Sequence, residues 1–225
     1  MKLLIVSATS LEIEPLLSYL GKGKILSENL SRYKSDKWTI DILITGVGMV
    51  ATTFWVGKTL AGRKYDFCIN AGICGSFDLN LELGSVVNVV EDSFPEKGAE
   101  SGEYFLSLVD LKLIDKDEFP FTGGKLINSS EIQNEIIDDL IKVKALTVNT
   151  VHGNTASIAR LMARTQADIE TMEGAAFFYV TFQYRIPCLQ IRAISNFVEH
   201  RDKGKWQIPL AIKNLNQLLA RLINE

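Results

Sequence analysis

Three polar side chains in this sequence have the chemistry to cleave a bond in a small molecule: Glu12, Glu173 and Asn196. Glu12 follows the first predicted strand, where a carboxylate can activate water as a general base. Glu173 begins a predicted helix, and a carboxylate there can hold two adjacent hydroxyl groups. Asn196 ends a buried strand and is our first candidate for contact with a substrate. The two acids also have structural explanations, because Thr9 and Glu12 form a capping-box pattern and a helix start favours negative charge.

A glycine-rich turn, N-A-G-I-C-G-S over residues 70–76, is the second candidate region. Two glycines flanking small residues at the end of a strand let a planar ligand approach the main chain closely. Gly72 and the hydroxyl of Ser76 are therefore candidate ligand contacts, although an ordinary tight turn is the alternative. A polar loop, N-T-V-H-G-N-T over residues 149–155, follows another predicted strand and adds Asn149 to the candidates.

Other motifs point away from cofactors. The segment Gly46–Ala51 matches the dinucleotide fingerprint G-x-G-x-x-A, but Asp66 begins a strand where the fingerprint needs an acid at the end of one. We interpret this segment as a tight turn whose amides point at a smaller ligand. His152 and His200 have no cysteine or carboxylate at a recognised metal-binding spacing, so we expect neither a metal nor an organic cofactor.

Composition bounds the class of protein. The 225 residues suit a single domain over 1–225, and 47% hydrophobic against 23% charged residues is a globular balance. A net charge of -3 with scattered cations favours a small-molecule partner over nucleic acid. No apolar run approaches the roughly 20 residues of a membrane span, so no membrane partner is expected. Three cysteines without a C-x-x-C pair, and an amino terminus too short for a secretory signal, favour the reducing cytoplasm.

Alternating strand and helix patterns predict an α/β fold, a three-layer sandwich with a mixed, mainly parallel twisted sheet between helices. In such sheets ligands bind outside the carboxyl ends of the strands, where the candidate residues lie. We assign no fold to residues 91–121 and expect a mobile flap or rim there. Strands are predicted over 2–7, 25–33, 38–44, 66–71, 85–90, 145–151, 168–171 and 188–197, and helices over 11–20, 46–61, 131–141, 156–164, 174–184 and 208–223.

Four pieces of the chain together resemble the nucleoside phosphorylase and nucleosidase superfamily. They are Glu12 behind the first strand, N-A-G-I-C-G-S, T-M-E-G-A-A from Thr171 and R-A-I-S-N from Arg192. Within that superfamily, the segment Ser195–Ile212 is similar to the futalosine hydrolases. The resemblance implies one α/β domain, association into a homodimer or larger homo-oligomer, and hydrolysis of a purine nucleoside. The reaction implied is release of hypoxanthine from futalosine, leaving dehypoxanthinylfutalosine, in menaquinone biosynthesis.

The resemblance also implies roles on the sugar side and around the base. Glu12 would orient and deprotonate the attacking water, and Met172 with Glu173 would hold the ribose. The purine would be lined by Gly72, Ser76 and the 149–155 loop.

The position of Asn196 is where this chain departs from the nucleosidases acting on methylthioadenosine and S-adenosylhomocysteine, which have aspartate there. An asparagine amide can donate to O6 of hypoxanthine and accept from a protonated N7. It cannot give a proton, so protonation of the leaving base would come through water or be partly replaced by hydrogen bonding.

Several alternatives stay open at this stage. The substrate could be 6-amino-6-deoxyfutalosine, methylthioadenosine or S-adenosylhomocysteine. A purine nucleoside phosphorylase would need convergent cations, and the turn 7–10 and the 70–76 turn contain no Arg or Lys. A non-catalytic purine nucleoside-binding protein is the alternative outside enzymes. The aromatic residues Phe177, Phe178 and Tyr179, with the first helix, could form a subunit interface or simply belong to the core.

Overall fold

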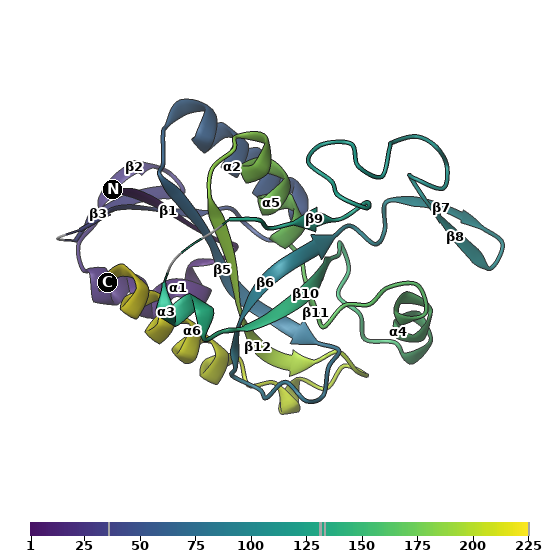
Figure 1. Ribbon diagram of the computed structural model, residues 1–225. Helices are drawn as coiled ribbons and strands as arrows, with labels where there is room; N and C mark the ends of the chain where they lie inside the picture. The colour runs from purple at the N-terminus through teal and green to yellow at the C-terminus, as the bar shows by residue number, and fades with distance from the viewer. Residues whose placement is uncertain (36, 131, 133, 225) are drawn as a thin grey trace.

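A mixed β-sheet runs through the molecule and is covered by helices on both faces (Figure 1). The computed structural model describes residues 1–35, 37–130, 132 and 134–224. Over that part of the chain, ten strands join the sheet. They are β1 (Lys2–Ser7), β2 (Lys24–Ser27), β3 (Leu30–Lys34), β4 (Thr39–Ile44), β5 (Phe67–Ser76), β6 (Val86–Ser93), β9 (Leu126–Ile127), β10 (Ile141–Thr147), β11 (Ile169–Thr171) and β12 (Cys188–Phe197).

The pairing of the strands brings distant parts of the chain together at one end of the sheet. Strands β12, β5, β1 and β4 run parallel to one another, as do β6, β10 and β11. Antiparallel pairing joins β6 to β12, and β11 also pairs antiparallel with β5. Strands β5, β12, β6, β10 and β11 therefore close into a ring. The predicted α/β fold with a mixed sheet between helices is confirmed.

Alternating burial explains the three layers. In β1, Leu3 and Ile5 belong to one hydrophobic cluster, whereas Leu4 and Val6 belong to the other. A strand buried on both faces must carry helices on both sides. The first cluster is covered by α1 (Ser10–Leu20), α3 (Glu135–Asp138) and α6 (Ile208–Asn224), and the second by α2 (Met49–Gly62) and α5 (Gly174–Gln183).

Helix α6 shows how sequence periodicity sets these contacts. Its buried apolar residues Ala211, Leu215, Leu218 and Leu219 recur at helical spacing and form one stripe against the sheet. Helix α5 is instead buried over most of its length, including Phe177 and Phe178. These two aromatic residues are core, so the predicted interface role does not apply to them.

Several predicted boundaries are corrected. The helix expected over 131–141 is only the four-residue α3, although positions 131 and 133 lie outside the described residues. Strand β10 begins at Ile141 because Ile141 to Ala145 alternates apolar and charged residues, which is the period of a strand. The strand expected over 25–33 is divided into β2 and β3 by a turn, and β3 pairs antiparallel with β4.

The segment 91–121, which received no fold from the sequence, contains the hairpin of β7 (Gly98–Ser101) and β8 (Tyr104–Ser107). This hairpin projects from the body of the molecule (Figure 1). Its mobility stays a prediction. Helix α4 (Thr155–Met162) lies on the same side of the molecule as the hairpin (Figure 1).

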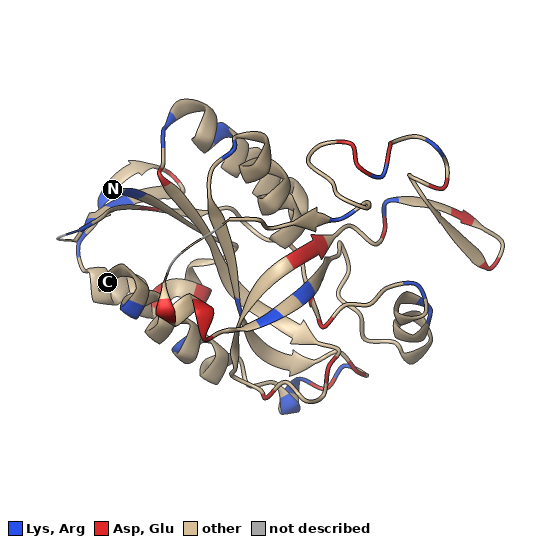
Figure 2. Ribbon diagram, in the orientation of Figure 1, with Lys and Arg blue, Asp and Glu red and all other residues tan. Residues whose placement is uncertain are grey.

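Charges of both signs are distributed along the chain, as the sequence predicted (Figure 2). Among the described helices, none is long and apolar enough to cross a membrane.

Candidate active site

A cavity of about 340 Å³ lies where the ends of β1, β5, β11 and β12 meet the starts of α1 and α5. Four of the residues selected from the sequence line it: Glu12, Met172, Glu173 and Asn196. The loops that follow these strands supply the rest of the wall. This is the end of the sheet at which ligands of α/β proteins gather.

Glu12 is fixed by donors from two elements. Its Oε2 accepts hydrogen bonds from the backbone N–H of Thr9 at 3.0 Å and from the Thr9 hydroxyl at 2.9 Å, which completes the predicted capping box. Its Oε1 accepts from the backbone N–H of Ile73 at 3.1 Å. The side chain is therefore buried in the cavity wall with only acceptor contacts, which suit an ionised carboxylate.

Glu173 is held by the turn before α2. The backbone N–H of Gly48 donates to Oε1 of Glu173 at 2.9 Å. Gly48 has φ of 98°, a conformation that favours glycine. A glycine is therefore needed at this position of the turn to present its N–H to Glu173. The prediction that this turn aims its amides at a ligand is therefore corrected for Gly48, whose partner is a side chain of the protein.

Arg192 is buried beside Glu173. It is 1% exposed, and its Nη1 lies 3.9 Å from Oε2 of Glu173. Its other nitrogens donate to Gln190 and Asn70. Arg192 therefore forms a structural ion pair with a candidate catalytic acid.

Gly72 provides the space for this arrangement. A Cβ at Gly72 would stand 2.8 Å from Oε1 of Glu12 and would also collide with Nη1 of Arg192. Gly72 is therefore behind the two charged groups, and it is not among the residues that line the cavity.

Burial raises the pKa of Glu173, while the positive charge of Arg192 and the Gly48 hydrogen bond act in the opposite direction. The nearby charge of Glu12 raises this pKa further. The positive charge of Arg192 therefore favours the charged form of Glu173, against the effect of burial.

Asn196 lies on β12, in the wall of the cavity. Its Nδ2 donates to the carbonyl oxygen of Phe197 at 2.9 Å, and its Oδ1 lies 2.8 Å from the hydroxyl of Ser195. The amide has a second N–H and a second acceptor site on its oxygen. It can therefore donate to one atom of a ligand and accept from another.

Ser76 and Asn149, like Gly72, are predicted contacts that do not line this cavity. Ser76 is completely buried, and its hydroxyl donates to the carbonyl oxygen of Asp78 at 2.8 Å, because β5 continues to Ser76 instead of ending at Ala71. Asn149 is exposed, and both its backbone N–H and its side-chain amide donate to Glu96. The structure therefore corrects the prediction that these residues line the base.

His152 and Glu170 also line the cavity. His152 belongs to the 149–155 loop that was predicted to line the base, whereas Glu170 was not selected from the sequence. The backbone N–H of His152 donates to Oε1 of Glu170 at 2.9 Å, and Nδ1 of its ring lies 2.8 Å from Oε2. Burial raises the pKa of Glu170, and the hydrogen bonds from His152 counter that effect. The polar 149–155 loop was the sequence signal for His152. The carboxylate that bonds to His152, that of Glu170, comes from a separate strand, β11.

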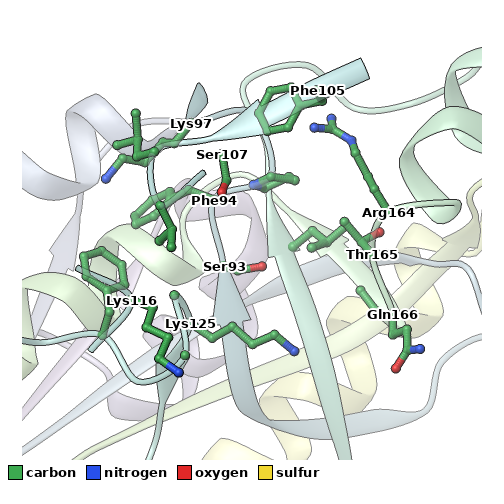
Figure 3. Close-up of a pocket in the computed structure, with 18 of the residues that line it drawn as sticks. Ser93, Phe94, Lys97, Phe105, Ser107, Lys116, Lys125, Arg164, Thr165 and Gln166 are labelled. Carbon is green, nitrogen blue, oxygen red and sulfur yellow. The ribbon is translucent and has the colours of Figure 1, made fainter. Parts of the chain in front are cut away.

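A larger cavity of about 710 Å³ lies between the β7–β8 hairpin and the end of α4 (Figure 3). Lys97, Lys125 and Arg164 are among its lining residues. The carboxylates in its lining are already engaged, since Glu91 is bonded to Lys125 at 2.6 Å and Asp110 accepts from Ser107. Among the described residues, no group of three or more His, Cys, Asp or Glu side chains is arranged to hold a metal ion.

Comparison with known proteins agrees with this geometry. The family model of the phosphorylase superfamily matches residues 2–224. A futalosine hydrolase of Streptomyces coelicolor is 30% identical over 193 residues, covering 83% of this chain and 79% of the relative. A 5′-methylthioadenosine/S-adenosylhomocysteine nucleosidase of Glaesserella parasuis is 22% identical, covering 100% of this chain and 99% of the relative. The native structure of futalosine hydrolase of Helicobacter pylori shares the fold, with a TM-score of 0.82 at 16% identity, and covers 100% of this chain and 97% of that one.

Proposed function

This chain belongs to the phosphorylase superfamily, and we propose that it is a nucleosidase that hydrolyses the N-glycosidic bond of futalosine. The products are dehypoxanthinylfutalosine and hypoxanthine, and the reaction belongs to menaquinone biosynthesis. The observation that carries this proposal is that two buried carboxylates, Glu12 and Glu173, share a cavity with the amide of Asn196. Such a reaction needs one carboxylate that activates the water, a second that binds the sugar, and a polar group that recognises the base.

In the proposed reaction, Glu12 orients and deprotonates the attacking water. Its backbone and hydroxyl donors hold the carboxylate in place before the substrate arrives, so little reorganisation is needed during the reaction. General base catalysis of this kind contributes about 10² to 10⁴ in rate.

Glu173 and Met172 hold the ribose in this proposal. Positive charge develops on the sugar ring as the glycosidic bond breaks, and the negative charge of Glu173 stabilises it. The ion pair with Arg192 keeps Glu173 in position.

Asn196 recognises the base. Hypoxanthine presents two acceptors, O6 and N7, to this edge of the cavity. The second N–H of the amide donates to O6, and the amide oxygen accepts from N7 once that atom is protonated. An ionised aspartate in the same place would repel O6, which is why asparagine favours an oxopurine over an aminopurine.

Water rather than phosphate is the nucleophile in this proposal. A phosphate dianion requires several convergent cations or N–H donors. Arg201 is the one Lys or Arg side chain among the described residues that line the cavity, and Arg192 is buried behind it. Phosphorolysis is therefore the less favoured alternative.

The test is to incubate the protein with futalosine, 6-amino-6-deoxyfutalosine, inosine and methylthioadenosine, each with and without phosphate, and to quantify the free base. We expect hypoxanthine from futalosine at a rate that phosphate does not change. Release of adenine from methylthioadenosine at the higher kcat/KM would instead identify the aminopurine nucleosidase. Tight binding of nucleoside without any base release would favour the non-catalytic binding protein.

We further propose that residues 1–225 form one domain, because one sheet contains strands from β1 to β12. The homodimer or larger homo-oligomer and the cytoplasmic location stay predictions. Val50 and Phe54 of α2 are 79% and 58% exposed and are candidate contacts between subunits. Light scattering on the purified protein would measure the number of subunits.

A further inference from the structure

Three neighbouring strands place Glu170, Gly75 and Asn196 in one row. Gly75 of β5 is paired with Asn196 of β12 on one side and with Glu170 of β11 on the other. Directly paired residues of adjacent strands present their side chains to the same face of a sheet. The row therefore places a carboxylate and an amide on either side of a residue that has no side chain.

Glu170, Gly75 and Asn196 all line the candidate cavity, and we call the part of the cavity along this row the slot. A Cβ on Gly75 would stand 2.9 Å from Cγ2 of Val198, 3.2 Å from Nδ2 of Asn196 and 3.7 Å from Cγ of Glu170. Because Val198 packs this closely against Gly75, a residue with a side chain does not fit between Glu170 and Asn196 without displacing its neighbours.

His152 occupies the Glu170 side of this slot. Both oxygens of Glu170 are engaged by His152, one by its backbone N–H and one by Nδ1 of its ring. The ring is 15% exposed and lines the cavity. Among the described residues Nε2 has no hydrogen-bond partner, so this nitrogen is the one left for a ligand.

A carboxylate bonded to Nδ1 gives a histidine ring a fixed orientation and stabilises its protonated form. That is the arrangement of a general acid that delivers a proton from Nε2. Asn196, on the other side of Gly75, can only hydrogen-bond. The cavity therefore contains a proton donor at the base, in addition to the amide.

We infer that His152, oriented by Glu170, contacts the purine across the slot from Asn196 and donates a proton to it as the glycosidic bond breaks. This inference rests on the proposed nucleosidase function. His152 is then a catalytic residue, and Glu170 is a positioning residue that acts through it.

Two proton transfers accompany the breaking of the glycosidic bond. The bond between the sugar C1′ and the base nitrogen breaks, and its electron pair passes to the purine. The proton on Nε2 moves to a ring nitrogen of the purine, which leaves as neutral hypoxanthine, and the imidazole becomes neutral. The water oxygen bonds to C1′ while its proton passes to Glu12. Loss of that proton to solvent and return of one from solvent to His152 restore the enzyme.

The first test compares His152→Gln with His200→Gln. Glutamine keeps a hydrogen-bond donor but cannot give up a proton, and His200 is exposed and is the only other histidine in the sequence. We expect His152→Gln to lower kcat for futalosine by about 10² to 10⁴ and His200→Gln to leave it unchanged. Unchanged kcat in His152→Gln would overturn the inference.

A leaving group that needs no proton separates catalysis from structure. The 4-nitrophenolate of 4-nitrophenyl riboside leaves without protonation, so its release should be nearly the same in wild type and His152→Gln. Glu170→Gln should show the same selective loss with futalosine, and the double variant should lose no more than His152→Gln alone. Equal losses with both substrates would mean that the His152–Glu170 pair only maintains the fold.

Binding of the product provides a measurement that does not depend on turnover. With only two histidines in the chain, the ring ¹⁵N signals can be assigned by His200→Gln. We expect added hypoxanthine to shift the His152 signals and not those of His200. Hypoxanthine that binds by calorimetry without shifting the His152 signals would overturn the inference. Absence of both hypoxanthine binding and base release would instead refute the proposed function.

Discussion

Glu12 and Ile73 are joined by a hydrogen bond of 3.1 Å from the backbone N–H of Ile73 to Oε1 of the carboxylate. The bond connects the first turn of α1 to the middle of β5, which are separated by many residues in the chain. A carboxylate that only completed a capping box would need Thr9 alone. The additional contact joins Oε1 to β5, and both Glu12 and Ile73 line the cavity.

We predict that Glu12→Gln lowers kcat for base release from futalosine by about 10² to 10⁴ with little change in KM, because an amide cannot take a proton from water. Initial rates of hypoxanthine formation measure both constants. Glu14→Gln is the matched control, since Glu14 is exposed on the same helix and should retain full activity. Equal rates for the Glu12 variant and wild type would remove Glu12 from the mechanism.

Gly72→Ala is predicted to impair both activity and stability. The added Cβ would stand 2.8 Å from Oε1 of Glu12 and would collide with Arg192, so both charged groups must move. Such overpacking costs about 1 to 3 kcal/mol of unfolding free energy. Denaturant unfolding and kcat/KM for futalosine measure the two effects.

Gly57→Ala is the comparison for the Gly72 variant. Gly57 lies inside α2, and a Cβ there meets nothing within 4 Å. We expect this variant to retain activity and to gain about 0.5 to 1 kcal/mol of stability from the higher helix propensity of alanine. A Gly72→Ala protein as active and stable as Gly57→Ala would show that the close approach of Glu12 and Arg192 is not required.

Asn196→Asp is predicted to shift substrate preference toward aminopurine nucleosides by roughly tenfold or more, a change of the size expected for one altered hydrogen bond. An ionised carboxylate would repel O6 of hypoxanthine and accept from a 6-amino group. The measurement is the ratio of kcat/KM for futalosine to that for 6-amino-6-deoxyfutalosine. Asn128→Gln, a change of another amide outside the cavity, is the control. If the ratio stays constant, Asn196 does not select the base.

The sequence predicted the parts of the fold that have long, regular patterns. Strand β12 and helix α5 begin where expected, because a continuous apolar run and a glycine after an acid define their starts. The error at 131–141 arose where a short helix is followed directly by a strand, since a few apolar residues fit either period. The β7–β8 hairpin carries no strong apolar alternation, because its residues are mostly exposed or half-buried.

Position relative to a strand was enough to select three residues that the structure brings together, and their roles stay predictions. Glu12, Glu173 and Asn196 were selected because they follow a strand or end one, and all three line the cavity. His152 and Glu170 could not be paired from the sequence, since their contact depends on β11 lying beside β10, the strand before the loop that carries His152. Ser76 was misplaced for a related reason, as the length of β5 follows from pairing with β12 and not from local composition.

Asp92 is a completely buried carboxylate behind the site. Its oxygens accept from the side-chain amide of Gln190 at 2.9 Å, from the hydroxyl of Thr147 at 3.0 Å and from the backbone N–H of Ser93 at 2.8 Å. Burial raises its pKa to about 7, and these hydrogen bonds together with Arg192 only partly offset the effect of burial.

The raised pKa of Asp92 makes stability depend on pH. An unfolded aspartate titrates near pH 3.9, so between about pH 4 and pH 7 the folded protein binds more protons than the unfolded chain. The contribution of Asp92 to the unfolding free energy is therefore fully present below pH 4. It declines by up to about 1.4 kcal/mol per pH unit as the pH rises to 7, and it is constant above that.

Asp92→Asn removes this titration. We expect the unfolding free energy of the variant, relative to wild type, to increase as the pH is raised from 5 to 7 and to change little from 7 to 8. Urea unfolding at each pH measures the difference. Asp139→Asn, at an exposed aspartate, controls for the loss of one negative charge. The test is the change of the unfolding free energy with pH, so a constant loss of stability from the new amide does not affect it. Parallel stability curves for the Asp92 variant and wild type would contradict the expected titration of Asp92.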